Sequence, residues 1–219
     1  MRTGCKFCQK FSGVVGGEEI PDRVLFESEN FVVVPTIGSI VPGWLLVVPR
    51  SHFLSAGSLD AALLQELICL RSTAEEALRD CFGSVTCFEH GAVRECESVG
   101  CGVDHAHLHL VASKFDLVAN AKAPSTSQLH WREVAGIQAA TACIAEQMPY
   151  VFVESASEGA WIGTGSIIES QLMRKVIATS MDQPGCWDWK THPFESNANE
   201  TYYRLKAWKD NRVVLLPHA

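Results

Sequence analysis

Three histidines at alternate positions, His105, His107 and His109, constrain how this chain can fold more than any other feature. Neighbouring side chains of a β-strand point to opposite faces of a sheet, so a strand over residues 105–111 places the three imidazoles on one face. The small and apolar residues between them then face the core. Because three imidazoles are costly to bury without partners, we expect this face to border a cleft that holds a ligand, a metal ion or both.

The chemistry of the histidine run admits three interpretations. The run can be a polar face in contact with water, or it can supply ligands to a metal site. It can also be catalytic, because a neutral imidazole attacks a phosphorus centre and leaves again, which splits one displacement into two easier steps. We favour a cleft over an exposed face because histidine is a scarce residue type.

The pattern around the histidines predicts an α+β domain, in which a helix packs on an antiparallel sheet of about five strands. Short β-rich runs separated by turn residues predict the strands. Apolar residues at steps of three and four, such as Leu63, Leu67 and Leu70, predict the helix. The strands are expected at residues 23–27, 30–34, 44–48, 84–89 and 105–111, and the helix at residues 59–79.

The rest of the chain predicts an α/β extension. Residues 122–128, which are small, polar and broken by Pro124, are the best candidate for a linker. We therefore expect a catalytic domain over residues 1–120 and an extension over residues 121–219 that packs on the same domain. The extension is expected to hold helices over 131–144, 166–181 and 199–209, a strand over 150–154, and Trp187 and Trp189 as core anchors.

Composition and charge exclude several classes of protein. The apolar share of 47% supports a hydrophobic core, and the formal net charge of −7 argues against a nucleic-acid polymer as partner. No run approaches the ~18 apolar residues that a membrane-spanning helix needs. The first residues lack the apolar core of a secretory signal, so we expect a cytoplasmic protein without membrane contact.

The cysteines point to metal ligands or free thiols. Their number, nine, is odd, and no secretory signal accompanies them, so a disulfide framework is not favoured. Cys5 and Cys8 have the Cys-x-x-Cys spacing of a zinc knuckle. The alternative is a pair of buried thiols without a metal.

Taken together, these segments resemble the histidine triad family of nucleotide hydrolases and transferases, and they imply its HIT-like fold. The resemblance covers roughly residues 5–113. It rests first on the His-x-His-x-His run, which is followed by two apolar residues. Further shared features are Pro42-Gly43 with the strand that ends at Pro49, then His52, the Cys5-x-x-Cys8 motif, and the strand pair around Phe26 and residues 31–34.

The resemblance implies a role for each histidine. His107 would attack the α-phosphorus of a nucleotide conjugate and form a nucleotidyl-imidazole, which water or an acceptor then breaks. His109 would lie near the scissile oxygen and help the leaving group depart, and His105 would hold the geometry of the site. The implied partner is a small-molecule nucleotide or nucleotide conjugate. Small family members commonly dimerise, which leaves a homodimer open.

The resemblance also implies a structural zinc ion. In bacterial relatives two such cysteines bind zinc together with a histidine after the proline-rich strand and the first histidine of the triad. The corresponding positions in this chain are Cys5, Cys8, His52 and His105. A zinc ion at His105 is compatible with His107 as nucleophile, because the two roles belong to different residues.

Several positions differ from the family pattern, most of them near the expected phosphate. Trp44 stands where a further histidine is common, and Gly100-Cys101-Gly102 replaces a glycine-glutamine-serine sequence. Our candidates for binding phosphate instead are the backbone amides of Gly100 and Gly102 and the side chain of Arg174.

The sequence thus favours a hydrolase or nucleotidyltransferase that acts on nucleotide conjugates through a covalent intermediate on His107. Hydrolysis is preferred to transfer because no acceptor site is readable. Two alternatives remain. One is a nucleotide-binding or sensing protein with low turnover, and the other is a zinc-containing enzyme that carries out a different reaction on a small metabolite.

Overall fold

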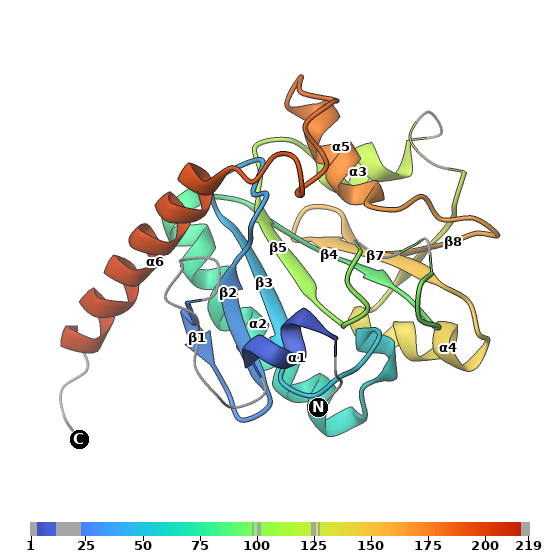
Figure 1. Ribbon diagram of the computed structural model, residues 1–219, viewed down its shortest axis with the longest axis horizontal. Helices are drawn as coiled ribbons and strands as arrows, with labels where there is room; N and C mark the ends of the chain where they lie inside the picture. Colours follow the sequence, from blue (N-terminus) through green and yellow to red (C-terminus); the bar gives the residue numbers. More distant parts are fainter. Residues whose placement is uncertain are drawn as a thin grey trace.

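One antiparallel sheet forms the centre of the computed structural model, which describes residues 4–11, 23–97, 99, 102–123, 126 and 128–215. Within these residues the sheet has eight strands in the order β1-β2-β3-β5-β4-β7-β8-β6, and neighbouring strands are antiparallel (Figure 1). The strands are β1 (Phe26–Glu27), β2 (Phe31–Pro35), β3 (Trp44–Pro49), β4 (Val85–Gly91), β5 (Leu108–Ala112), β6 (His130–Val134), β7 (Tyr150–Ser155) and β8 (Gly159–Thr164).

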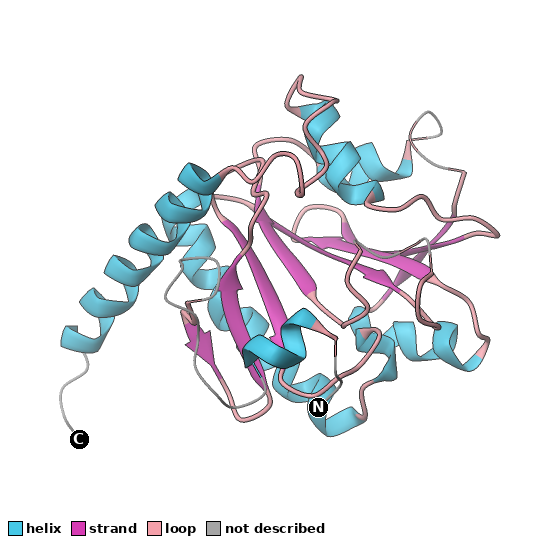
Figure 2. Ribbon diagram, in the orientation of Figure 1, coloured by secondary structure: helices cyan, strands magenta, loops and turns pink. Residues whose placement is uncertain are grey.

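Helices cover both faces of this sheet (Figure 2). On one face lie α2 (Ala61–Phe82), α4 (Ala140–Ala145), α6 (Glu195–Leu215) and the 3-10 turns η2 (Ala56–Ser58) and η3 (Ile137–Ala139). On the other face lie α1 (Lys6–Phe11), α3 (Leu117–Lys122) and α5 (Leu172–Ser180). None of the helices described here combines the length and the apolar character needed to cross a membrane.

Burial on both faces explains why the sequences of β2 and β3 are continuous apolar runs. In β2, Phe31 and Val33 face the side of α2, while Val32 and Val34 pack with Phe11 of α1. Strands β3 and β5 are also buried along their whole length. A strand that is covered on both sides has no polar face, so it lacks the alternation typical of a half-exposed strand.

The long helix α2 confirms the helix expected at residues 59–79. Asp60 caps its first turn by accepting a hydrogen bond from the backbone amide of Leu63 (2.9 Å). Gly83 follows its last turn with a φ of 103°, a conformation that side-chain-bearing residues rarely adopt.

The expected α+β class is confirmed, but the sheet has eight described strands where about five were expected. The additional strands, β6, β7 and β8, come from the chain after residue 120. Strand β7, which confirms the strand expected at residues 150–154, pairs with β4 from Thr86↔Ser155 to Gly91↔Tyr150. The later part of the chain therefore continues the same sheet.

The helix expected over residues 131–144 is largely wrong, because His130–Val134 forms strand β6 and α4 covers only Ala140–Ala145. Strand β6 pairs with β8, and the ring of Trp131 covers Gly163, where a Cβ atom would lie 2.9 Å from that ring. This pairing outweighs the helical periodicity of the apolar residues, since tertiary contacts routinely override local propensity.

The two last helices agree with the sequence in type but differ in extent. Helix α5 begins at Leu172 and not at Ser166, because Gln171 before it has a left-handed φ of 58° and interrupts the helical backbone. The helix expected over residues 199–209 is confirmed within the longer α6.

A buried carboxyl group links β4 to the turn η2. Glu89 is 1% exposed, accepts a hydrogen bond from the Tyr150 hydroxyl (2.5 Å), and accepts another from the backbone amide of Ala56 (2.7 Å). Burial raises the pKa of Glu89 from 4.5 to about 7, although both hydrogen bonds favour the charged form. The folded protein therefore holds a proton on Glu89 at a pH where the unfolded chain has lost it.

This raised pKa makes stability depend on pH. The contribution of Glu89 to the free energy of unfolding is fully present below pH 4.5 and is lost as the pH rises to about 7. From pH 5 to pH 8 the wild type should lose about 2–3 kcal/mol of its free energy of unfolding through Glu89, because each unit of pKa shift is worth about 1.4 kcal/mol. Glu89→Gln, whose amide does not titrate, should not show this loss. Urea unfolding at both pH values measures this difference. Glu29→Gln, at an exposed site, is the control and should show the same loss as the wild type.

Candidate functional site

The histidine segment enters the sheet later than the sequence predicts, because β5 begins at Leu108. The backbone amides of His105 and Ala106 donate to the carbonyl groups of Val103 and Phe53 (2.9 and 2.6 Å). Neither acceptor lies in a strand. The expectation of one continuous strand over residues 105–111 is therefore wrong at its beginning, and the three imidazoles have different surroundings.

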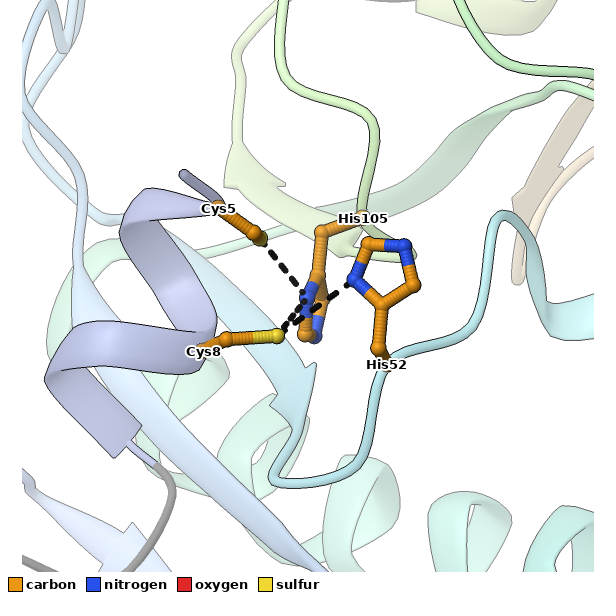
Figure 3. Close-up of side chains that lie close together, drawn as sticks. All are labelled: Cys5, Cys8, His52 and His105. Atoms are coloured by element: carbon orange, nitrogen blue, oxygen red, sulfur yellow. Dashed lines mark hydrogen bonds between the residues drawn. The ribbon is translucent and has the colours of Figure 1, made fainter. Parts of the chain in front are cut away.

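His105 belongs to a cluster of four potential metal ligands (Figure 3). The ligand atoms of Cys5, Cys8, His52 and His105 all lie within 4.8 Å of one another. His105 Nδ1 is 3.3 Å from Cys5 Sγ and 3.6 Å from Cys8 Sγ, and His52 Nδ1 is 3.4 Å from Cys8 Sγ. Figure 3 shows Cys5, directly before α1, and Cys8, within α1, pointing toward the imidazoles of His52 and His105.

The bonding of His105 favours metal ligation. Its Nε2–H donates to the Pro49 carbonyl (2.8 Å), so in the neutral ring the lone pair is on Nδ1, which faces both sulfur atoms. Such a carbonyl contact is the usual way to fix the tautomer of a metal-bound histidine. Burial, together with the Cys8 thiol, raises the pKa of Cys5, and a bound cation would favour its thiolate. These residues could therefore hold a metal ion.

His107 and His109 line a separate pocket of about 210 Å³ between α1, the ends of β2 and β3, and α5. The rings of the two histidines are 4.9 Å apart. His105 is not among the described residues that line this pocket. The other lining residues are Lys6, Phe7, Lys10, Phe11, Val34, Pro35, Thr36, Ile37, Leu46, Val103, Arg174 and Trp189.

The tautomer of His107 is fixed by the backbone. Its Nδ1 lies 2.7 Å from the His105 carbonyl oxygen, which can only accept, so Nδ1 carries the proton and Nε2 carries the lone pair. Burial, aided by the positive charge of Arg174, lowers the pKa of His107. In the neutral ring the lone pair is therefore on Nε2, and His107 lines the pocket.

The tautomer of His109 is fixed by Trp44. The indole Nε1–H of Trp44 donates to His109 Nδ1 (3.0 Å), so the proton of the neutral ring is on Nε2. The ring of His109 stacks on Phe88 at 4.4 Å. Burial lowers the pKa of His109 well below that of a free imidazole, and the nearby His107 and His90 lower it further. His109 can therefore act as a neutral hydrogen-bond donor.

Arg174, a predicted phosphate ligand, lines the same pocket but is anchored to the backbone. It is 2% exposed, and its guanidinium donates to the carbonyl groups of Gly38 (2.5 Å) and Trp187 (2.8 Å). Gly38 has a φ of 75°, and a Cβ atom there would lie 2.4 Å from Cβ of Trp189, so only glycine fits this close approach. Arg174 thus gives the pocket wall a fixed positive charge.

Of the two glycines predicted to bind phosphate, only Gly102 is among the residues that the structure describes. Gly100 lies outside the described residues. Gly102 lines a different pocket, of about 470 Å³, together with Cys5, His52 and Lys190. The structure therefore gives Gly102 no contact with the histidine pair.

Sequence reasoning missed the pocket residues that come from α1 and from the segment before α6. Lys6 and Lys10 line the pocket from α1, which the sequence did not predict as a helix. Trp187 packs beside the core as expected, whereas Trp189 is half-buried in the pocket wall. The Cys-x-x-Cys motif marked this segment in the sequence as a candidate metal site but did not indicate a helix.

Comparison with known proteins gives a family match to the part of the chain that carries the histidines. A family model described as the HIT domain matches residues 17–116. This range includes His52 and the three histidines of the run but excludes Cys5 and Cys8. Comparison with curated proteins gives no match.

Solved structures with a similar arrangement include a HIT family protein from Bacillus anthracis (18% identity, 53% of this chain and 77% of that chain, TM-score 0.43). A hypothetical histidine triad nucleotide-binding protein from Sulfolobus tokodaii has 22% identity over 51% of this chain and 71% of that chain (TM-score 0.40). A HIT family hydrolase from Clostridium thermocellum has 19% identity over 52% of this chain and 93% of that chain (TM-score 0.38). At these identities and TM-scores the likeness carries no argument of its own.

The ligand cluster generates a prediction about metal content. We expect the purified protein to contain one bound divalent metal ion per chain and Cys8→Ser to lose it, because the cluster then keeps only three ligands. The melting temperature should fall with the metal content. Elemental analysis and a thermal melt measure both. Cys69→Ser, at an exposed cysteine of α2, is the control, and equal metal content in both variants would refute the ligand set.

The contact between Trp44 and His109 generates a second prediction. Trp44→Phe removes the donor to Nδ1, so the proton of His109 should redistribute between the two ring nitrogens. The lost partner should also destabilise the fold by about 1–3 kcal/mol, since a buried acceptor is left unpaired. Nitrogen-15 NMR of the imidazole reads the tautomer directly. Trp161→Phe, whose indole donates to the Glu158 carbonyl, should leave the His109 signals unchanged.

Proposed function

Because the chain belongs to the histidine triad superfamily, with a HIT domain at residues 17–116, we propose that it hydrolyses or transfers the nucleotidyl group of nucleotide conjugates through His107. The observation that carries this proposal is the hydrogen bond from His107 Nδ1 to the His105 carbonyl (2.7 Å). It keeps the lone pair on Nε2 of a ring that lines the pocket. A neutral imidazole in this state is a nucleophile without the help of a separate base.

In the proposed reaction, His107 Nε2 attacks the α-phosphorus, a nitrogen–phosphorus bond forms, and the bond from phosphorus to the leaving group breaks. In this proposal the Nε2–H of His109, whose other nitrogen accepts from Trp44, would donate a hydrogen bond to the departing atom. Water or an acceptor then attacks the phosphorus, and the nitrogen–phosphorus bond breaks to restore His107. Hydrolysis is our choice over transfer.

The fixed charge of Arg174 supports this assignment. A nucleotide phosphate is anionic, and phosphoryl transfer depends mainly on positioning and on stabilising negative charge. Arg174 donates to two backbone carbonyls, so its guanidinium does not have to reorganise when a phosphate enters the pocket. In this proposal residues 121–219 complete the site, because Arg174 and Trp189 supply part of its wall.

We propose zinc as the metal of the ligand cluster, with a structural role. Bond lengths of about 2.3 Å to sulfur and about 2.0 Å to nitrogen give a tetrahedron with nitrogen–sulfur edges of about 3.5 Å. The separations of 3.3, 3.4 and 3.6 Å in the cluster fit such a tetrahedron. All four positions are taken by protein ligands, so zinc would tie α1 to the segment before β5. The reacting histidine, His107, is a different residue from the ligand His105.

A second candidate function is nucleotide binding or sensing with little turnover. The observation that favours it is the commitment of Arg174 to the carbonyls of Gly38 and Trp187, which leaves fewer of its donors for a phosphate. Trp44 adds to this argument, since it stands beside His109 where a further histidine is common in the family. Binding without a covalent intermediate distinguishes this function from the first.

The covalent intermediate is the direct test. We expect a nucleotidyl adduct on His107 when the protein is mixed with an adenosine phosphoramidate or a dinucleoside polyphosphate and quenched within the first turnover. Intact-mass and peptide mass spectrometry locate the adduct. His107→Asn should abolish it and reduce turnover by at least about a thousandfold, as removal of a nucleophile does.

His130→Asn is the matched control, because His130 lies exposed on β6 and takes no part in the pocket. It should form the adduct at the wild-type rate. Nucleotide binding without an adduct in the wild type would support the sensing function. An adduct that persists in His107→Asn would overturn the assignment of the nucleophile.

A further inference from the structure

One peptide group connects the ring of His107 to the loop after β3. This peptide group joins His105 to Ala106. Its N–H, on Ala106, donates to the Phe53 carbonyl (2.6 Å). Its C=O, on His105, accepts from Nδ1 of His107 (2.7 Å). A trans peptide group is planar, and its N–H and C=O point in opposite directions, so a bond that holds one end also aims the other. The Phe53 carbonyl therefore sets the direction from which His107 is bonded.

The segment that carries Phe53 is held in place by two side chains on the α2 face of the sheet. Phe53 leads into the turn η2, and two backbone amides of that turn donate to side chains of the sheet. Ala56 donates to Glu89 (2.7 Å), and Gly57 donates to the Tyr150 hydroxyl (3.1 Å). The hydroxyl in turn donates to Glu89 (2.5 Å), so the three bonds form one network. Glu89 on β4 and Tyr150 on the neighbouring β7 thus fix the turn against the sheet.

This network lies directly against the histidine run. Glu89 and Tyr150 are 1% and 0% exposed. One cavity of about 10 Å³ is lined from both sides, by Glu89 and Ala56 of the network and by Ala106 and His107 of the histidine run. A cavity of that size holds at most about one water molecule. A displacement of η2 is therefore passed on to the peptide group beside it and is not absorbed by solvent.

Hydrogen bonds to Glu89 and Tyr150 hold η2 more precisely than apolar packing does. Hydrophobic contacts have no preferred direction, whereas a buried network with all its bonds made favours one arrangement. Both carboxyl oxygens of Glu89 are bonded, one to Ala56 and the other to Tyr150. A buried carboxyl group is costly without such partners. The network therefore specifies the position of the backbone that it bonds.

We propose that Glu89 and Tyr150 are positioning residues for His107. By holding η2 they keep the Phe53 carbonyl on the amide of Ala106, and the carbonyl of the same peptide group then keeps Nδ1 of His107 as the donor. Neither side chain is among the described residues that line the histidine pocket, so they affect the rate of the chemical step and not the binding of substrate. This inference rests on the proposed function for the role of His107 as nucleophile. The tautomer of the ring is measurable without any reaction.

Nuclear magnetic resonance of the resting protein tests the positioning. In Tyr150→Phe the amide of Ala106 should exchange with solvent about tenfold faster relative to that of Leu110, since one hydrogen bond of the network is lost. Nitrogen-15 shifts should show the His107 ring divided between its two tautomers. Leu110 lies in β5 between β3 and β4, so a loss of overall stability would speed both amides alike. Tyr202→Phe, at a buried tyrosine of α6, is the matched control and should change neither reading.

Two substitutions of Glu89 separate hydrogen bonding from packing. Glu89→Gln keeps an oxygen for the Ala56 amide and a donor for the Tyr150 oxygen, so it should keep the wild-type tautomer of His107. Glu89→Leu loses both bonds. It should slow adduct formation on His107 about a hundredfold, as a misplaced reacting group does, and change the affinity for adenosine monophosphate about twofold or less. Circular dichroism checks the fold of each variant. Where Glu89→Leu does not fold, the milder Tyr150→Phe decides, with an expected loss in rate of about tenfold.

The outcomes separate this inference from the proposed function. A wild-type tautomer of His107 in the folded Tyr150→Phe and Glu89→Leu variants would overturn the positioning, whether or not the wild type forms an adduct. Adduct formation at the wild-type rate in both variants would also overturn it and would leave the proposed function standing. A mixture of tautomers in the variants, with no adduct in the wild type, would support the positioning and remove the catalytic role of His107.

Discussion

The site depends on how two neighbouring histidine rings bond to the backbone. His105 donates from Nε2 to the Pro49 carbonyl and presents Nδ1 to the cysteines, whereas His107 donates from Nδ1 to the His105 carbonyl and keeps its lone pair on Nε2. A backbone carbonyl can only accept, so each contact decides which nitrogen carries the proton. In our proposal the same motif therefore provides a metal ligand and a nucleophile two residues apart, without competition between the two roles.

The part of the chain after residue 120 contributes to the surroundings of these histidines. It adds β6, β7 and β8 to the sheet, and it brings Arg174 and Trp189 to the pocket. Arg174 also lies over the ring of Trp44 at 4.9 Å, and Trp44 in turn donates to His109. A residue from the extension is thus coupled through one indole to the histidine run. In this way the later part of the chain brings a positive charge to the pocket of His107 and His109.

The sequence predicted the parts of this arrangement that depend on local pattern. The α+β class, the helix α2 and the strands β2, β3 and β4 follow from periodicity and turn residues, and the Cys5, Cys8, His52 and His105 set follows from the family resemblance. It failed where long-range contacts decide. Residues 130–134 become a strand because β8 pairs with them, and His105 leaves the strand face because the backbone amide of Ala106 bonds to Phe53. No local signal specifies either partner. The lysines of α1 were missed for the same reason, since α1 packs through Phe11 against β2 and β3.

The central claim is that the metal-binding cluster and the phosphate pocket are separate sites served by different histidines. A crystal structure with a non-hydrolysable nucleotide, with anomalous data collected at the zinc edge, tests it most directly. The account predicts an anomalous peak bonded to Cys5, Cys8, His52 and His105, and a phosphorus atom about 3–3.5 Å from Nε2 of His107, the distance of reacting atoms poised for attack. A metal bonded to His107 or His109, or a nucleotide phosphate away from His107, would contradict it.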